Sequence, residues 1–327
     1  MLRRLFSHFI TESSLYRKVQ HRRQFPGLSV SESASLEIDG QLFYGTASSI
    51  SERARIIVKN GSTLRIGQGV HIGRECEIAP RSEVEIGDST SIQDRSFIHG
   101  DVSIGRYCSL SLNVFVSAGT HCFDLYPEMF IKDQDLIWIN RPELVGRYSK
   151  SIRIEDDCWL GINSVVLPGA TIGKGAIIGA NSVVTNDIPP YSVAVGAPAR
   201  VIKQRLKFLP PPKINCSCTQ DLPYFYSGFA LSAEELDQGR RDGGVYAERR
   251  FRVVMDTTGT KTIVLEVRGL FPAACSICYG QQRAKISQEM RVIRFALGSD
   301  SLKSLEFTIS TEAKARWLIC VASVRVE

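Results

Sequence analysis

The side chains best suited to acid–base chemistry in this sequence are its five histidines. Histidine has an unperturbed pKa of about 6.5, so near neutral pH it can both accept and donate a proton. His8 and His21 lie in a basic N-terminal segment, and His71 and His99 fall at positions of a repeat that we expect to face solvent. His121 stands where that repeat is interrupted by a long segment without it. This position makes His121 the candidate for acid–base chemistry, such as taking a proton from the attacking group of a substrate.

Cysteines are the second group of residues that could do chemistry. The pairs Cys216-x-Cys218 and Cys275-x-x-Cys278 are spaced like two halves of a zinc site. They lie 57 residues apart (275 minus 218) with no histidine nearby, and the ends of a three-residue step project from opposite faces of a strand. We expect no metal site here. The count of nine is odd, and the N-terminus has no recognisable export signal, so we expect reduced thiols in a cytoplasmic protein.

A six-residue repeat surrounds His121 on both sides in the sequence. Between about residues 56 and 201 an aliphatic residue recurs at every sixth position and is often followed by glycine, apart from one longer step before Ile86 and the interruption after Val116. The repeated positions are Ile66, Ile72, Ile78, Ile86, Ile92, Ile98, Ile104, Leu110, Val116, Ile154, Leu160, Val166, Ile172, Ile178 and Val184. Neither an α-helix nor a flat strand has this period, whereas three short strands per turn with tight corners do. We predict stacked coils about 4.8 Å apart, each strand burying one aliphatic side chain.

Length, composition and pattern predict how the whole chain is divided into domains. The 327 residues are 43% apolar and 23% charged, which indicates about two globular domains. We expect a basic amphipathic helix over residues 1–25, the coil stack over 35–207 with an excursion at 119–151, a proline-rich linker at 208–223, and an antiparallel β-sandwich over 224–327. No run of about 18 apolar residues occurs, so we expect no membrane-spanning helix.

The positive charge is concentrated at the N-terminus. Residues 1–23 carry a net +5 out of the chain's +6, so the other 304 residues sum to about +1. A nucleic-acid-binding protein would carry a basic face across its body, so we expect no nucleic-acid partner. The tail leaves two interpretations open. Either it lies peripherally on the inner face of a membrane, or its apolar stripe packs on the coil stack.

Two segments give the coil stack a family resemblance. Residues 113–121 read Asn-Val-Phe-Val-Ser-Ala-Gly-Thr-His, and residues 157–202 contain Trp-Leu-Gly-Ile-Asn at 159–163 and Gly-Ala-Pro-Ala-Arg at 196–200. Both resemble hexapeptide-repeat acyltransferases, in particular the galactoside and maltose O-acetyltransferases and the xenobiotic acetyltransferases. The resemblance implies an all-β fold built on a left-handed parallel β-helix, a homotrimer, and acetyl-CoA bound between neighbouring subunits.

The same resemblance implies roles for individual residues. His121 matches the family's catalytic histidine. The residues implied to contact acetyl-CoA are Trp159, Gly161, Ile162, Ala180, Arg200 and Lys203, and those implied to contact a sugar acceptor are Gln93, Asp94 and Asn113. Asp124 is a candidate to orient His121 and is equally a turn residue.

We therefore expect a CoA-dependent O-acetyltransferase acting on a sugar hydroxyl in surface-polysaccharide or glycolipid synthesis. N-acetylation of an amino-sugar and acetylation of a xenobiotic remain alternatives, because a hydroxyl and an amine make similar demands on one base. A zinc enzyme of the γ-carbonic-anhydrase kind is excluded, since position 116, five before His121, is valine and not a ligand. His121 and the motif around Trp159 also argue against a non-catalytic scaffold.

Overall fold

The computed structural model describes residues 25–272, 274–297 and 304–327. The chain forms two compact units, Met1–Lys207 and Phe208–Glu327, which are described separately below. The helix expected over residues 1–25 falls, except for Phe25, outside the described residues. Among the residues described, no helix is long and apolar enough to cross a membrane.

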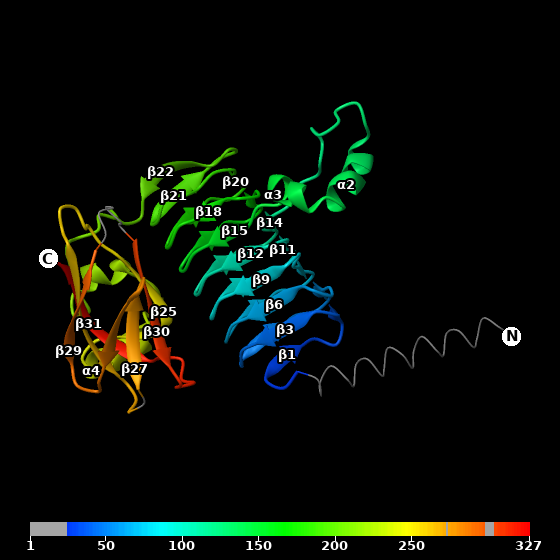
Figure 1. Ribbon diagram of the computed structural model, residues 1–327. Helices are drawn as coiled ribbons and strands as arrows, with labels where there is room; N and C mark the ends of the chain where they lie inside the picture. Colours follow the sequence, from blue (N-terminus) through cyan, green and yellow to red (C-terminus); the bar gives the residue numbers. More distant parts are fainter. Residues whose placement is uncertain (1–24, 273, 298–303) are drawn as a thin grey trace. The chain divides into compact units, whose positions relative to one another are not determined.

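The first unit is a parallel β-solenoid of three sheets (Figure 1). Sheet A contains β1 (Leu28–Val30), β4 (Ser48–Ile50), β7 (His71–Ile72), β10 (Ser91–Ile92), β13 (Ser109–Leu110), β16 (Trp159–Leu160), β19 (Ile177–Ile178), β21 (Ser192–Val195) and the antiparallel β22 (Arg200–Gln204). Sheet B contains β2 (Ser35–Ile38), β5 (Arg55–Val58), β8 (Glu77–Ala79), β11 (Phe97–His99), β14 (Phe115–Ser117), β17 (Val165–Val166) and β20 (Val183–Val184). Sheet C contains β3 (Gln41–Tyr44), β6 (Thr63–Ile66), β9 (Glu83–Ile86), β12 (Val102–Ile104), β15 (Ile152–Ile154) and β18 (Thr171–Ile172).

The six-residue repeat fills the interior of this solenoid. Every repeated aliphatic residue of the sequence pattern is buried, and equivalent residues pair in register, as Ile92 does with Leu110 and Ile98 with Val116. The predicted coil stack is therefore confirmed. His71 and His99 lie on the outward faces of their strands, half-buried, as their repeat positions indicated.

The corners of the coils differ from the expected pattern. We expected small residues to supply the permissive backbone, yet left-handed φ angles occur at Arg95, Asn113 and Asn163, among other non-glycine residues. Glycine is needed elsewhere, directly after the strand, where the next coil packs closely. A Cβ at Gly161 would lie 2.6 Å from the backbone nitrogen of Ala180. Close approach of two coils, rather than φ, thus requires the glycine there.

The long excursion leaves the solenoid after β14 and returns at β15. It contains α2 (Ile131–Ile139), the 3₁₀ turn η1 (Pro142–Leu144) and α3 (Val145–Tyr148), and it projects from the coils in Figure 1. The Lys150 N–H donates to the Ala118 carbonyl at 2.8 Å, and β15 pairs with β12 in register from Val102–Ile152 onward. The coil therefore closes around the base of the excursion without a shift.

The second unit is a strongly curved antiparallel sheet. Its elements are β23 (Lys213–Asn215), η2 (Thr219–Tyr224), β24 (Phe225–Phe229), α4 (Ala233–Arg241), β25 (Val245–Val254), β26 (Thr262–Gly269), β27 (Cys275–Tyr279), β28 (Gln282–Ile286), β29 (Arg291–Ala296), β30 (Ser304–Thr311) and β31 (Ile319–Val326). The strand order is β28-β27-β30-β25-β31-β26-β29, and the Gln282 side chain bonds both backbone polar groups of Ala296 at 2.8 Å. The two ends of one sheet thus meet around a core with Phe251 and Phe307.

Two expectations for this unit take a different form. The stretch 208–223, expected as a linker, contributes β23, which pairs with β31. The expected sandwich is a single rolled sheet instead of two separate ones. In this unit Trp317 is half-buried and stacks on Tyr246.

Candidate functional site

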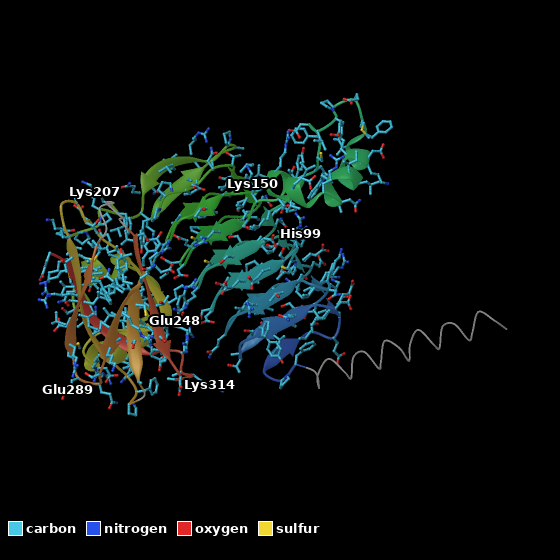
Figure 2. The ribbon with its side chains drawn as sticks, in the orientation of Figure 1. His99, Lys150, Lys207, Glu248, Glu289 and Lys314 are labelled. Carbon is cyan, nitrogen blue, oxygen red and sulfur yellow. The ribbon has the colours of Figure 1, made fainter. Side chains whose placement is uncertain are left out.

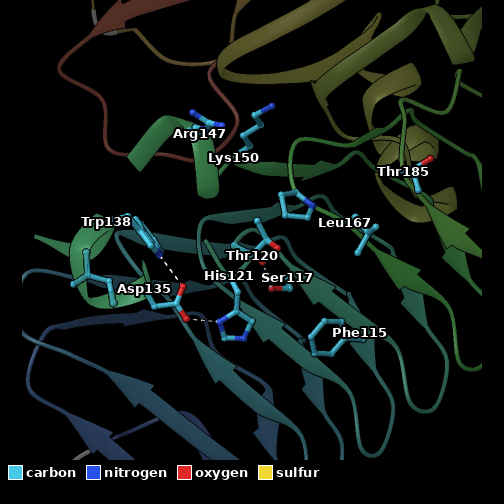
Figure 3. A pocket seen from close by; sticks show the side chains of 13 residues that line it. Phe115, Ser117, Thr120, His121, Asp135, Trp138, Arg147, Lys150, Leu167 and Thr185 are labelled. Atoms are coloured by element: carbon cyan, nitrogen blue, oxygen red, sulfur yellow. Dashed lines mark hydrogen bonds and ion pairs between the residues drawn. The ribbon is translucent and has the colours of Figure 1, made fainter. Parts of the chain in front are cut away.

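His121 is held by a carboxylate from the excursion. Its imidazole is 79% exposed and stands just past the end of β14. The ring atom Nδ1 lies 2.6 Å from Oδ2 of Asp135, which comes from α2 (Figure 3). No residue in the described part of the chain forms a hydrogen bond with the other ring nitrogen, Nε2, which is therefore accessible to solvent.

Asp135 is in turn fixed through its second oxygen. Oδ1 accepts the Cys122 N–H at 2.8 Å and the Trp138 Nε1–H at 3.1 Å. Partial burial by itself raises the pKa of Asp135, but these hydrogen bonds and the one with His121 outweigh it and hold the pKa below its usual range. The carboxylate is therefore an acceptor only, so Nδ1 of His121 must donate, and the neutral ring keeps Nε2 as its acceptor.

Hydrogen bonds of Gln134 connect the parts of the excursion that present these groups. The buried Gln134 side chain accepts from the Leu125 and Tyr126 N–H groups at 3.2 and 3.0 Å. It also donates to the Met129 carbonyl at 3.1 Å, which ties the loop before α2 to the helix itself. The acid–base pair therefore stands on a structured segment.

Asp124, the sequence candidate for orienting His121, forms other contacts. Its two oxygens accept from the Tyr148 hydroxyl and from Arg147 Nη2, both at 2.7 Å. The hydrogen bond from Tyr148, followed by the one from Arg147, lowers the pKa of Asp124. The orienting residue is Asp135, which lies 14 positions after His121 in a helix, so no local motif marks it.

A cavity of about 790 Å³ surrounds His121. Its lining combines apolar, hydroxyl and charged groups: Phe115, Ser117, Gly119, Thr120, His121, Asp135, Trp138, Ile139, Arg147, Lys150, Leu167, Pro168 and Thr185. All of them come from the excursion or from sheet B and the corner that follows it. A hydroxyl-bearing molecule in this cavity could reach Nε2 of His121.

A second set of candidate residues gathers on sheet A. Trp159 is 52% exposed, and its Nε1–H donates to Ser111 Oγ at 3.2 Å. In the register of the sheet Trp159 pairs with Ile177, Ile177 with Val193, and Val193 with Lys203, so Trp159 and Lys203 share one outward row. Arg200 is exposed on the same β22 and donates to the neighbouring Ala199 carbonyl.

The corner after sheet A holds Gly161, Ile162 and Ala180, with Ala180 stacked one coil beyond Gly161. The Gly161 N–H donates to the Ile178 carbonyl at 2.8 Å, so it is not available to a ligand. Among the described residues the N–H groups of Ile162 and Ala180 have no such acceptor. They are the backbone donors that this corner offers.

The three candidate acceptor contacts lie on the same corner, in earlier coils. Asp94 forms an ion pair with Arg74 at 2.7 Å, and the hydrogen bond from Arg74 lowers the pKa of Asp94. Asn113 accepts from Arg95 and donates to Asn163, and the Gln93 amide donates to Ser91. Asp94 and Asn113 thus bind neighbouring coils together in this structure.

Within one chain these two sets are separated. His121 follows a strand of sheet B, whereas Trp159, Ile162 and Ala180 lie on sheet A and on the corner before sheet B. A strand of sheet B therefore stands between the proposed base and the proposed CoA contacts. Among the described residues, His, Cys, Asp and Glu side chains form no group of three that could hold a metal ion, and no thiol is in a disulfide.

Comparison with known proteins agrees with the repeat. Residues 151–186 match the family model of the bacterial transferase hexapeptide (six repeats). A protein of Mycobacterium tuberculosis named as an acetyltransferase is 34% identical over 181 residues, which are 55% of this chain and 50% of the relative. A protein of Schizosaccharomyces pombe that is also named as an acetyltransferase is 55% identical over 103 residues, or 32% of this chain and 43% of that one. The chain thus spans about half the length of the curated relatives it matches.

Solved structures give weaker matches. A maltose O-acetyltransferase from Clostridium difficile 630 aligns at 27% identity and a TM-score of 0.30, over 42% of this chain and 70% of that one. An N-acyltransferase from Bacillus cereus, in complex with dTDP and Coenzyme A, aligns at 18% identity and a TM-score of 0.37, over 58% and 89%. The sequence matches identify residues 151–186 as a transferase hexapeptide repeat and confirm the resemblance of this chain to hexapeptide-repeat acetyltransferases.

Proposed function

We propose that this protein transfers an acetyl group from acetyl-CoA to a hydroxyl of a sugar, with His121 as the general base. The observation that carries the proposal is the His121–Asp135 pair, which leaves Nε2 free to accept a proton inside a cavity large enough for a sugar. The names of the sequence relatives support acetyl transfer, and the resemblance of the Trp159 segment supports CoA as the donor.

The chemistry follows from the ring's tautomer. Nε2 of His121 takes the proton as the acceptor oxygen bonds to the thioester carbonyl carbon. The imidazolium that forms is stabilised by the Asp135 carboxylate 2.6 Å from Nδ1. When the carbon–sulfur bond breaks, His121 returns the proton to the departing thiolate, so the base is regenerated and CoA leaves as the free thiol. The N–H groups of Ile162 and Ala180 are our candidates for the donors that stabilise the oxyanion.

The donor site that we propose comprises Trp159, Ile162 and Ala180, with Gly161 serving close coil packing and Arg200 and Lys203 facing the CoA phosphates. Trp159 and Lys203 share a row, which fits an elongated molecule lying along sheet A. Fixed cations at the far end suit phosphate groups. The acceptor contacts Gln93, Asp94 and Asn113 remain proposals, with Asp94 and Asn113 already engaged by the coils.

We further propose that the working unit is a homotrimer. His121 and the proposed donor site lie on different corners of one coil stack, so a neighbouring copy must bring the donor site of one chain to the base of another. Sheet B also exposes Phe97 and Phe115, at 37% and 38%, in one outward row beside the cavity. Burial of such a row against another copy would be favourable.

The test is CoA release from acetyl-CoA, followed with a thiol reporter against a panel of sugars and amino-sugars. We expect sugar-dependent release that His121→Ala lowers about 10² to 10⁴-fold while CoA binding is retained. His71→Ala is the matched control, because His71 lies on sheet A and bonds Ser49. Full turnover by the His121 variant would refute its role, and release with amino-sugars alone would assign N-acetylation instead. The setting in polysaccharide or glycolipid synthesis is part of the proposal and calls for the natural glycan.

A further inference from the structure

The cavity around His121 also contains two cations that the proposed proton transfer does not use. Arg147 and Lys150 both line it, and Figure 3 shows them on the other side of the cavity from the His121 ring. Both belong to the segment where the excursion rejoins the solenoid, and Figure 2 shows Lys150 at that base.

Arg147 is already neutralised in part. Its Nη2 donates to Asp124 at 2.7 Å, and its guanidinium lies over the Tyr148 ring, 5.5 Å from the centroid. The Asp124 hydrogen bond raises the pKa of Arg147 further above its ordinary value. Arg147 therefore stays charged in a fixed place, with its charge shared by one carboxylate.

Lys150 is anchored but carries no such partner. Its N–H donates to Ala118 at 2.8 Å, and its carbonyl accepts the Gly169 N–H at 3.1 Å, so the backbone is fixed between two coils. A Cβ on Gly169 would come within 3.2 Å of the lysine side chain, which places the aliphatic stem along that glycine. Of the residues that the structure describes, none offers a carboxylate within ion-pair distance of the Lys150 ammonium.

The remaining charges of the cavity do not compensate this cation. Asp135 is the carboxylate in its lining, and both of its oxygens are engaged, by His121 on one side and by Cys122 and Trp138 on the other. The lining also has an apolar part, formed by Phe115, Leu167 and Pro168, which suits the C–H face of a sugar ring. The cavity thus presents one uncompensated positive charge beside an apolar wall.

From this arrangement we infer that the acceptor is an acidic sugar, whose carboxylate, sulfate or phosphate group is bound by Lys150 while a hydroxyl faces Nε2 of His121. The inference rests on the proposed function for the direction of the hydroxyl, whereas the anion subsite stands on the charges alone. Arg147 supports the same anion from the second side of its guanidinium.

The experiment compares two probes that share one ring, methyl β-D-glucuronide and methyl β-D-glucoside, on the full chain. Dissociation constants are measured by isothermal titration in the presence of CoA, and KM for acetyl-CoA by thiol release. We expect the wild type to bind the glucuronide about tenfold more tightly, as one hydrogen-bonded charge pair allows. Lys150→Gln should remove this preference and Lys150→Arg should keep it. Lys132→Gln, on the exposed face of α2 and outside the cavity lining, is the matched control and should also keep it.

Equal affinity for both probes in the wild type, no binding of either, or a preference that survives Lys150→Gln would overturn the subsite. A raised KM for acetyl-CoA in that variant, with the sugar preference unchanged, would also overturn it and assign Lys150 to a CoA phosphate. A Lys150-dependent preference without any thiol release supports the subsite and refutes acetyl transfer, so the two proposals fail separately.

Discussion

Replacing Asp135 by asparagine tests the acid–base pair with almost no change in shape. Oδ1 of Asp135 accepts two N–H donors, from Cys122 and Trp138. The asparagine oxygen must stay at that position, because the reversed amide would set its NH₂ group against both donors. The NH₂ group then faces Nδ1 of His121 and donates to it. Nδ1 becomes the acceptor, the ring proton moves to Nε2, and the base is lost in its productive form.

The size of the effect follows from what it takes to restore the right tautomer. Reversing the amide leaves the Cys122 and Trp138 N–H groups without acceptors, at about 1.5 kcal/mol each. The total of about 3 kcal/mol corresponds to a loss of roughly 10²-fold in kcat. Binding of CoA should not change, since Asp135 belongs to the excursion and the proposed donor site lies on sheet A.

The assay is thiol release in Asp135→Asn, with the ¹⁵N NMR spectrum of His121 reporting the tautomer directly. Asp124→Asn is the matched control, because Asp124 bonds Tyr148 and Arg147 and not His121. We expect the control to keep its tautomer and most of its activity. If Asp135→Asn keeps wild-type turnover, or if its His121 still carries the proton on Nδ1, the reasoning is wrong.

The other predictions concern assembly, stability and the outlying segments. Multi-angle light scattering should give three times the 36.3 kDa of one chain, and an active monomer would remove the intersubunit site. Burial lowers the pKa of Lys174 to about 8, so between pH 8 and 10.5 the unfolded chain holds the extra proton and stability rises with pH. Over that range the wild type should gain about 3 kcal/mol relative to Lys174→Met in urea unfolding, and parallel curves would refute the shift. Truncation after Lys207 should leave CoA binding intact and lower transfer to the natural glycan only; loss of CoA binding would make the second unit structural. Deletion of residues 1–23 should weaken sedimentation with anionic vesicles at low salt, and unchanged sedimentation would favour a packed helix.

The solenoid could be predicted from the sequence because its six-residue period recurs in the coils. Each buried position, from Ile66 to Val184, belongs to a repeat that no other regular structure shares. The interrupted repeat also marks the point where the chain leaves the stack, and His121 lies just beyond it, four residues after the end of β14.

The partner of His121 could not be found in the same way. Asp124 is close in sequence, yet α2 brings Asp135 to the ring across 14 residues, and this depends on how Gln134 and Cys122 fix the loop. Strand alternation in the sequence could not predict the rolled sheet either. Alternation shows which face of each strand is buried, but it does not show that the two edges of the sheet meet through Gln282. The corner glycines could not be explained from the sequence for a similar reason. Close contact between neighbouring coils requires glycine there, whereas local backbone preference does not.

The closure of the coil beneath the excursion has a consequence for how such proteins can diversify. The excursion begins and ends at Ala118 and Lys150, whose backbones are one hydrogen bond apart, and the strands on either side stay in register. The length and sequence of the intervening chain therefore do not affect the packing of the other coils. The entropic cost of closing a loop also grows only slowly with loop length. Segments of quite different length could be exchanged at this point without disturbing a single coil. The acceptor, and even the presence of a base, could then change by inheritance of one insertion while the proposed donor site on sheet A stays the same.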